Sequence, residues 1–302
     1  MSLVRQIRDM ARGWRWTRRP LVPASAAPHV DEGEDDEFPT AWARTPPARI
    51  ARDALQRFGL KPLVWSQVSP AVRGLDNLDA LTGPVVFASN HSSHLDAPLL
   101  LNSLPPAWRR RTAVNAASDY FFTAWWRATA TTLLFNAFPV DRDGGRLSEL
   151  PGELLDDGWN LLLFPEGGRS DDGWVQGFLR GAGFLCLRHG IPAVPVAIRG
   201  AFAAMPPGRG WPRPGRLPVT VHYGPPVRPR DGERSGDFAQ RLENAVARLL
   251  DEDEDSWWAS LRRAAEDQTP SARAPDVARW RRVWEASRPL PSAGDRRGAW
   301  RR

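Results

Sequence analysis

The sequence of 302 residues lacks several features that would each indicate a class of protein. It has one cysteine, Cys186, which excludes an intramolecular disulfide and a metal site built from cysteines. Nowhere do about 18 apolar residues follow one another without a charge, so no membrane-spanning helix is predicted. The first residues, MSLVRQIRDMARGWRWTRRP, lack the apolar run and cleavage site of a secretory signal. We therefore expect a cytosolic protein that would meet a membrane from one side only.

Lysine is almost absent. Lys61 is the only lysine among 41 basic residues, which face 35 acidic ones and give a net charge of +6. Because guanidinium binds phosphate through two nitrogens and keeps its charge at any relevant pH, this composition favours phosphate-bearing partners. A codon bias produces the same composition, so charge alone does not identify the partner. We expect no nucleic-acid partner.

Composition divides the chain into four parts. Residues 1–20 place apolar side chains at helical spacing on one face and arginines elsewhere, which predicts an interfacial helix or, alternatively, a solvated basic tail. Residues 21–48 are rich in acidic residues and proline, as is typical of a disordered linker. Residues 49–251 have the pattern of a folded domain. Residues 252–302 form a tail rich in Trp and Arg, predicted either to lie at a membrane interface or to pack its tryptophans on the domain.

Short apolar runs, separated by Gly, Pro or Asn, alternate with longer amphipathic runs in the folded part. The short runs predict strands at residues 84–89, 112–116, 135–140, 161–164, 193–198 and 219–223. The longer runs predict helices at residues 97–104, 119–134, 147–157, 177–189 and 237–251. Apolar strands separated by helices form parallel sheets that are covered on both faces. The sequence therefore predicts an α/β fold, with a largely parallel sheet flanked by helices in a single domain.

The densest polar cluster, residues 90–96, follows the predicted strand at residues 84–89. In open α/β sheets, ligand sites form at the carboxyl ends of strands. His91 and Asp96 are five residues apart, and a turn between them would fold the carboxylate back onto the imidazole. The carboxylate would fix the His91 tautomer and stabilise the imidazolium after the ring takes a proton from a substrate hydroxyl. This pair indicates general-base chemistry.

Three other interpretations of the cluster remain open. His91, His94 and Asp96 could bind a metal ion, but they supply at most three ligands, and the usual zinc spacings are absent. Ser92 or Ser93 could be a nucleophile, although neither lies in a G-x-S-x-G turn. The cluster could also be a helix N-terminus capped by serine and aspartate, which would leave the histidines unexplained.

Two further polar clusters follow predicted strands. Residues 164–170, FPEGGRS, contain two glycines that let the backbone approach a ligand, and Arg169, which can bind an anionic oxygen. Alternatively, residues 164–170 could be a tight turn with a surface ion pair. Residues 140–143, VDRD, indicate only a charged turn when taken alone. Three polar clusters at strand carboxyl ends in one domain predict one shared site.

Four motifs resemble, in order and spacing, those of the glycerolipid acyltransferases of the lysophosphatidic acid acyltransferase type, over about residues 49–227. They are Asn90-His91-x-x-x-x-Asp96, FPVDR at residues 138–142, FPEGGRS at residues 164–170 and VPV at residues 194–196. The resemblance implies an O-acyltransferase that moves a fatty acyl group from acyl-CoA or acyl carrier protein to the hydroxyl of a lysophospholipid, above all lysophosphatidic acid. It implies neither a metal nor a cofactor, and no covalent acyl-enzyme.

The resemblance also implies roles for individual residues. His91 would be the general base and Asp96 its orienting partner. The acceptor's phosphate would be held by residues of the second and third motifs: Arg142, Glu166, Gly167, Gly168 and Arg169. Many members carry Phe-Lys-x-Gly downstream, whereas residues 178–181 here read Phe-Leu-Arg-Gly, so Arg180 would supply the charge from an adjacent position.

A lipid acceptor further implies a peripheral enzyme on the cytoplasmic face of an anionic membrane surface. The aromatic residues within 120–126 would suit that surface, and a core helix packed on the sheet is the alternative. Other functions also remain open. They are acylation of a different lysolipid or glycolipid, a metal-dependent hydrolase, and an arginine-rich binding module without enzymatic activity.

Overall fold

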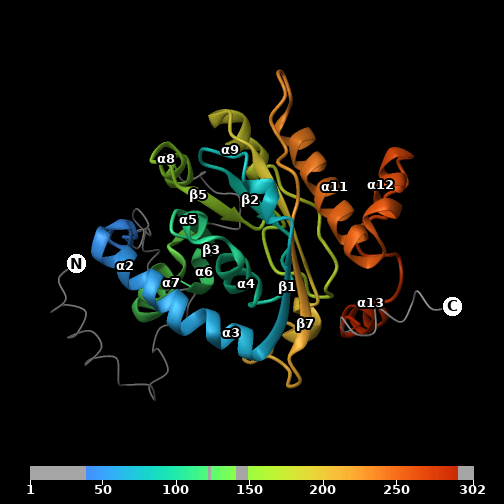
Figure 1. The fold of residues 1–302 in the computed structure, drawn as a ribbon, viewed down its shortest axis with the longest axis horizontal. Coiled ribbons are helices and arrows are strands. Elements are labelled where there is room, and N and C mark those ends of the chain that lie inside the picture. The colour runs from blue at the N-terminus through green and yellow to red at the C-terminus, as the bar shows by residue number, and fades with distance from the viewer. Residues whose placement is uncertain (1–38, 122–123, 141–148, 292–302) are drawn as a thin grey trace, which may run out of the picture. The chain divides into compact units, whose positions relative to one another are not determined.

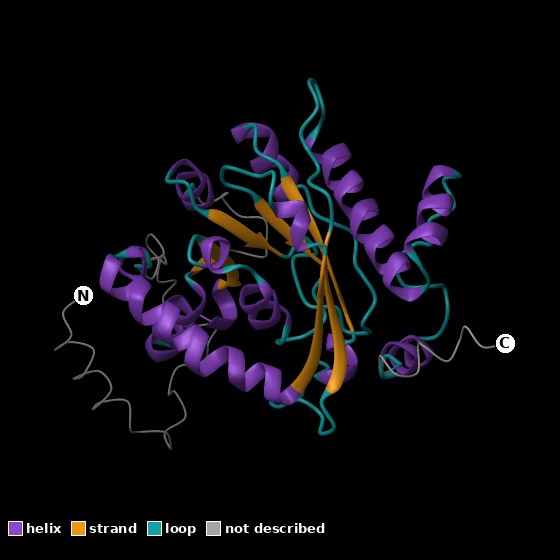
Figure 2. Ribbon diagram, in the orientation of Figure 1, coloured by secondary structure: helices purple, strands orange, loops and turns teal. Residues whose placement is uncertain are grey.

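The computed structural model describes residues 39–121, 124–140 and 149–291 of the chain. Within these residues, strands form one mixed sheet in the order β1-β7-β6-β2-β5-β3-β4 (Figures 1 and 2). The strands are β1 (Val68–Arg73), β2 (Val86–Ser89), β3 (Thr112–Ala117), β4 (Ala137–Val140), β5 (Asn160–Leu163), β6 (Ala193–Arg199) and β7 (Leu217–Tyr223).

Most strand pairs are parallel. Strands β6, β2, β5, β3 and β4 run in one direction, while β7 pairs antiparallel with β6 and parallel with β1. The residues of β2 and β5 are all buried, as is expected of short apolar strands covered on both faces. The prediction of an α/β fold with a largely parallel sheet is confirmed.

Helices surround this sheet. They are α2 (Pro46–Ala54), α3 (Lys61–Gln67), α4 (Asp96–Ser103), α5 (Pro106–Arg109), α6 (Ser118–Phe121), α7 (Trp125–Phe135), α8 (Leu150–Asp156), α9 (Gly181–His189), α10 (Ala201–Ala204), α11 (Ser235–Glu254), α12 (Trp257–Ala265) and α13 (Arg279–Ala286). A π-helical turn at Leu55–Leu60 joins α2 to α3. Short 3₁₀ helices lie at Ala41–Arg44 and Leu75–Leu78.

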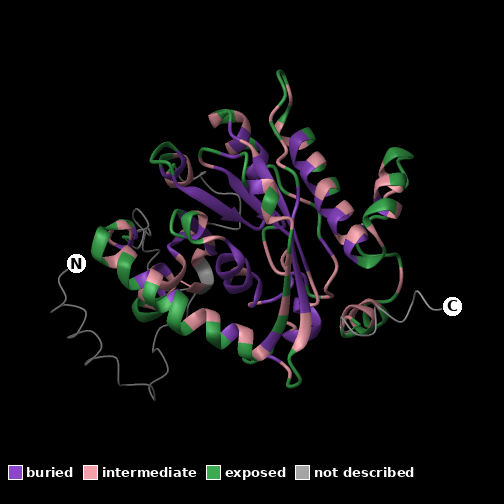
Figure 3. Cartoon of the chain, in the orientation of Figure 1, coloured by how far each residue is buried: buried purple, intermediate pink, exposed green. Residues whose placement is uncertain are grey.

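The core lies on both faces of the sheet. Side chains alternate along β2, so that Phe87 joins a cluster with Leu99 of α4, while Val86 joins another with Cys186 of α9 and Phe238 of α11. Figure 3 shows the central strands buried and the surrounding helices exposed on their outward sides. Because helices cover both faces of the sheet, a site is expected at the carboxyl ends of the strands.

The six predicted strands are present, but β1 was not predicted. Its sequence, VSPAVR, includes a proline and alternates between more and less exposed positions, because β1 is an edge strand paired only with β7. The helix expected over residues 119–134 is two helices, α6 and α7. Ala124 before α7 is extended, with φ −129° and ψ 127°, and no glycine or proline in the sequence marks that break.

The predicted segment at residues 1–20 lies outside the described residues, as does most of the predicted linker. Helix α2 begins at Pro46, three positions before the expected start of the domain at residue 49. In the predicted tail, the tryptophans of α12 and α13 do not pack on the domain as one expectation had it, since Trp258 is 69% and Trp280 is 73% exposed.

Among the helices of the described residues, none combines the length and the apolar character that a membrane span requires.

Candidate active site

The loops that follow β2 and β5 lie side by side, because these strands pair in parallel with Ala88 opposite Leu163. The backbone N–H of Ser170 donates to the carbonyl oxygen of His91 at 2.8 Å, which joins the two loops directly. The first and third motifs, about 75 residues apart in the sequence, thus form one surface at the carboxyl edge of the sheet.

His91 and Asp96 form the predicted pair. The Nδ1 atom of His91 lies 2.8 Å from Oδ2 of Asp96, whose side chain is fully buried, while the His91 side chain keeps 18% of its surface exposed. The same Oδ2 accepts the backbone N–H groups of Ser92 at 2.7 Å and Ser93 at 2.8 Å. Asp96 is also the first residue of α4, where the helix dipole favours a negative charge. These donors stabilise an ionised Asp96, which holds the proton on Nδ1 and leaves Nε2 as the acceptor.

The imidazole of His91 is held in place by more than Asp96. It stacks on the ring of Phe164, with the ring centroids 4.0 Å apart and the planes 19° apart. Its backbone N–H donates to Oε1 of Glu166 at 2.6 Å. The imidazole is therefore fixed by contacts from both loops before any substrate binds.

Glu166 is buried, and each of its carboxylate oxygens accepts a backbone N–H. Oε1 accepts from His91, and Oε2 accepts from Gln176 at 2.8 Å. Burial raises the pKa of Glu166 to about 8, although the hydrogen bonds from Gln176 and His91 oppose this rise. The side chain thus links the His91 loop to the segment after the third motif. Its predicted contact with the acceptor stays a prediction.

The glycines of the third motif form a tight turn. Gly167 has φ +76°, and a Cβ added there would lie 2.8 Å from Cδ1 of Leu179, so this position favours glycine for both backbone and space. Gly168 is half-buried, and a Cβ there would meet nothing within 4 Å. The turn therefore requires glycine at the first of the two positions, while the second leaves open space beside the backbone.

Arg169 presents a cation to this site. Its Nη1 atom is buried and has no hydrogen-bond partner among the described residues. Burial lowers the pKa of His94 to about 4, and the charges of Arg169 and His91 add to the effect, which places Arg169 within electrostatic reach of His94. A guanidinium with a buried donor to spare is suited to an anionic ligand.

The other two predicted arginines are Arg142 and Arg180. Arg142 lies outside the described residues. Arg180 is exposed and directly precedes α9. The hydrogen bond from Arg234 is the main cause that lowers the pKa of Asp237, and the charge of Arg180 adds to this effect. Its predicted role in acceptor binding stays a prediction.

The structure also reveals residues that hold the His91 loop and that the sequence did not single out for this role. The side chain of Asn90 exchanges two hydrogen bonds with the backbone of Ile198 in β6, at 2.9 and 2.8 Å. Ser93 donates its hydroxyl to the carbonyl oxygen of Met205 at 2.7 Å and accepts from the backbone N–H of Leu95. Ser93 is thus a structural anchor, with its hydroxyl committed to the backbone. Neither long-range partner leaves a signal in the sequence.

The metal alternative finds no support in the part of the chain that is described. No group of three His, Cys, Asp or Glu side chains in residues 39–121, 124–140 and 149–291 could hold a metal ion. Of the three candidate ligands, Asp96 already uses Oδ2 to accept three donors, and His91 directs Nδ1 to it.

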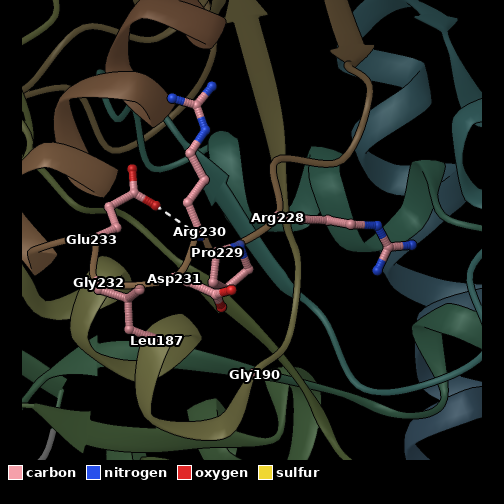
Figure 4. A pocket seen from close by; sticks show the side chains of 8 residues that line it. All are labelled: Leu187, Gly190, Arg228, Pro229, Arg230, Asp231, Gly232 and Glu233. Atoms are coloured by element: carbon pink, nitrogen blue, oxygen red, sulfur yellow. Dashed lines mark hydrogen bonds between the residues drawn. The ribbon is translucent and has the colours of Figure 1, made fainter.

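A surface hollow of about 560 Å³ lies at the amino end of β6, away from His91. It is lined by Leu187, Gly190, Arg228, Pro229, Arg230, Asp231, Gly232 and Glu233 (Figure 4). The carboxylate of Glu233 is already occupied there, because it accepts the backbone N–H of Arg230 and hydrogen bonds from Nη1 of Arg241 to both of its oxygens.

Helix α7 carries exposed aromatic side chains. Trp125 and Trp126 are each 56% exposed, whereas the Leu-rich half of the helix is half-buried. The exposed pair matches the predicted aromatic surface.

Comparisons with known proteins agree with this geometry. Residues 69–199 match the family model described as Acyltransferase. The chain is 31% identical over 169 residues to a 1-acyl-sn-glycerol-3-phosphate acyltransferase of Chlamydomonas reinhardtii, covering 53% of this chain and 49% of that protein. It is 27% identical over 187 residues to a chloroplastic 1-acyl-sn-glycerol-3-phosphate acyltransferase of Arabidopsis thaliana, covering 60% and 49%. The chain thus spans about half the length of the curated relatives it matches.

Among solved structures, the fold is similar to that of the 1-acyl-sn-glycerophosphate acyltransferase PlsC from Thermotoga maritima, with a TM-score of 0.57 and 23% identity over 72% of this chain and 88% of that one. The resemblance to the glycerolipid acyltransferases of the lysophosphatidic acid acyltransferase type is confirmed by the family match over residues 69–199 and by these relatives. The match extends from β1 to the end of β6. It does not include the part of the chain from β7 onward.

Proposed function

We propose that the protein is an O-acyltransferase that moves a fatty acyl group from a thioester donor to the hydroxyl of lysophosphatidic acid. The observation that carries the proposal is the His91–Asp96 pair, in which a buried carboxylate fixes the imidazole, together with the buried and unpartnered Nη1 of Arg169. Relatives named as 1-acyl-sn-glycerol-3-phosphate acyltransferases support the same acceptor.

The proposed reaction uses His91 as a general base. Nε2 takes the proton of the acceptor hydroxyl while its oxygen attacks the thioester carbonyl, and Asp96 stabilises the imidazolium that forms. The C–S bond then breaks, and the imidazolium returns the proton to the leaving thiolate. The products are an ester and a free thiol, and His91 regains its starting state. A base of this kind contributes about 10²–10⁴-fold to the rate.

The phosphate of the acceptor would be bound by Arg169. Its free Nη1 donor and its position within electrostatic reach of His94, three residues after His91, support this role. The Gly167 turn leaves its backbone exposed next to the arginine. Arg142 and Arg180 would complete the phosphate site, by the resemblance of their motifs. Acceptor phosphate bound here would keep the hydroxyl near Nε2 and so reduce the entropic cost of the reaction.

The donor would be acyl-CoA or acyl carrier protein, and the reaction would take place at an anionic membrane surface. The exposed pair Trp125 and Trp126, next to Arg127, supports contact with lipid headgroups, because Trp and Arg both suit that layer. The proposal includes neither a metal ion nor a cofactor, since the His–Asp pair supplies the base.

The test is a transfer assay with the full chain. Purified protein is incubated with labelled acyl-CoA or labelled acyl carrier protein and with lysophosphatidic acid, lysophosphatidylcholine, lysophosphatidylglycerol or monoacylglycerol, and products are separated by thin-layer chromatography. We expect phosphatidic acid as the main product, unaffected by a chelator. Transfer only to another acceptor would overturn the acceptor assignment, and activity lost on chelation would favour a metal-dependent enzyme.

A further inference from the structure

We propose that the C-terminal tail, beyond the residues that match the acyltransferase family, positions the acceptor side of the site, with Arg273 and Arg282 as positioning residues. The inference rests on the proposed function for the reaction it affects. The segment it concerns, residues 170–178, follows Arg169 directly and is called the motif loop here. Three residues of the tail hold this loop, through two guanidinium groups and through the backbone carbonyls of Ala272 and Arg282. Together they are called the tail clamp: Ala272, Arg273 and Arg282.

The first contact of the clamp is an ion pair 110 residues apart in the sequence. Nε of Arg282 in α13 donates to Oδ2 of Asp172 at 2.8 Å, and both side chains are largely buried. Oδ1 of Asp172 accepts the hydroxyl of Ser170 at 3.0 Å. Ser170 is the residue whose N–H donates to the carbonyl oxygen of His91. A short series of polar contacts therefore connects α13 to the backbone of the base.

The second contact holds the far end of the motif loop. Arg273 forms two hydrogen bonds to Glu243 of α11, with Nε 2.6 Å from Oε1 and Nη2 2.8 Å from Oε2. Oε2 of Glu243 in turn accepts the backbone N–H of Phe178 at 3.0 Å. Burial opposes ionisation of Glu243, but the hydrogen bonds from Arg273 and Phe178 outweigh it and lower the pKa. Arg273 thereby keeps Glu243 charged and able to hold the loop.

Between these two contacts the tail binds the backbone of the loop. The N–H of Val175 donates to the carbonyl oxygen of Ala272 at 3.2 Å, as in a short parallel bridge. The next residue, Gln176, donates its N–H to Glu166. The loop therefore lies between the tail on one side and the buried brace of the His91 loop on the other.

The largest apolar side chains of α13 do not cover the motif loop. Trp280 and Trp284 are 73% and 58% exposed, while the smaller Ala286 lies so close to the loop that a Cβ on Gly173 would lie 2.5 Å from its Cβ. The ion pairs and the backbone bridge therefore add polar contacts to a close approach of the tail to the loop.

The consequence concerns Arg169, which precedes the loop. When the clamp is removed, Ser170 and the turn at Gly167 lose part of their support, and the guanidinium of Arg169 is less well fixed relative to His91. The acceptor, which we propose binds there, should suffer more than the thioester donor. We expect a rise in acceptor KM of at least about fivefold for loss of one charged hydrogen-bond partner.

The experiment compares four full-length variants by steady-state kinetics in both substrates. Arg282→Gln and Arg273→Gln remove the two contacts, and Arg282→Lys restores a charge without the planar fork. The matched control is Arg281→Gln, an exposed neighbour in the same helix whose partner, Glu285, also lies within α13. We expect the first two to raise the acceptor KM with the donor KM unchanged, Arg282→Lys to recover part of the loss, and the control to match wild type.

A uniform loss in both substrates that follows the loss of thermal stability would overturn the positioning role, as would wild-type kinetics in Arg282→Gln. Hydrogen exchange separates this inference from the proposed function. The amides of Val175, Gln176 and Phe178 should exchange faster in Arg282→Gln and Arg273→Gln than in Arg281→Gln, whatever reaction the wild-type protein catalyses. Unchanged exchange would overturn the clamp, whereas faster exchange in a protein that does not acylate lysophosphatidic acid would overturn only the proposed function.

Discussion

The two loops of the candidate site are held in different ways. The His91 loop is fixed mostly by residues of the family-matched region: by Asp96 in the same segment, by Glu166, and by a hydrogen bond from Asn90 to Ile198, while Ser93 binds Met205 just beyond that region. The loop after the third motif also depends on side chains much later in the chain, in α11 and in the tail. The comparison teaches that the His91–Asp96 pair lies within one short segment, whereas the part of the site proposed for the acceptor is supported by elements that lie outside the matched residues.

The largest effect should follow removal of the base. His91→Ala should lower kcat by about 10⁴-fold, the upper end for a general base, because no other group takes the hydroxyl proton. Thermal unfolding should change little, since the side chain is partly exposed. The matched control is His189→Ala, because His189 forms the same kind of pair with the exposed Asp156 at 2.9 Å. Activity within a few-fold of wild type in His91→Ala would contradict the mechanism.

Asp96→Asn should have the next largest effect, about a 10²–10³-fold fall in kcat. The amide oxygen can still accept the N–H groups of Ser92 and Ser93, but it cannot stabilise the imidazolium of His91 as a carboxylate does. The control is Asp156→Asn. An equal fall in kcat in both variants would contradict a specific role of Asp96 in stabilising the imidazolium of His91.

The sequence predicted the locally built loop better than the other one. The five-residue spacing of His91 and Asp96 and the following helix α4 were enough to expect the pair, because the carboxylate and the turn that returns it belong to one short segment. The apolar runs of β2 and β5 likewise predicted where that segment would lie, since runs without polar alternation are typical of buried strands. Phe164 belongs to the third motif, but the sequence did not indicate that its ring stacks on His91.

The rest could not be predicted, because it depends on long-range partners. In the sequence, Asp172 and Arg282 look like ordinary surface charges. They are 110 residues apart, and no sequence pattern indicates that they form an ion pair. Glu166 was expected at the acceptor because of the family resemblance, whereas its observed partners are two backbone N–H groups, and a backbone N–H leaves no signal in the sequence. The edge strand β1 was missed because alternation and Pro70 make it look like a loop.

A smaller, more selective effect should follow from changing the arginine of the acceptor side. Arg169→Lys keeps the charge but loses the fork of donors, so we expect a loss of roughly 1–3 kcal/mol in acceptor recognition, seen as a raised KM for lysophosphatidic acid. The matched control is Arg234→Lys, an exposed arginine paired with Asp237. If the change raised the KM of the thioester instead, Arg169 would bind the donor. The proposal that one loop holds the base and the other binds the acceptor would then be wrong.

The last effect is on stability rather than on activity, and it concerns the side chain that joins the two loops. Burial raises the pKa of Glu166 to about 8, well above the ordinary value near 4.5. A carboxyl group with a raised pKa in the folded state binds its proton more tightly there than in the unfolded chain. The stability linked to that proton is therefore fully present below about pH 4.5 and is lost as pH rises through about 8.

Glu166→Gln should remove this dependence, so that the difference in unfolding free energy between the variant and wild type shifts in favour of the variant from pH 5 to pH 8. Each pKa unit corresponds to about 1.4 kcal/mol. The amide also replaces one of two accepting oxygens by a donor, so the bond to either the His91 or the Gln176 N–H is lost at every pH. Chemical denaturation at several pH values, with Glu233→Gln at the amino end of β6 as control, separates the two effects. A difference that does not vary with pH would mean that the two N–H donors keep Glu166 ionised, and that the link between the loops is a charged one throughout.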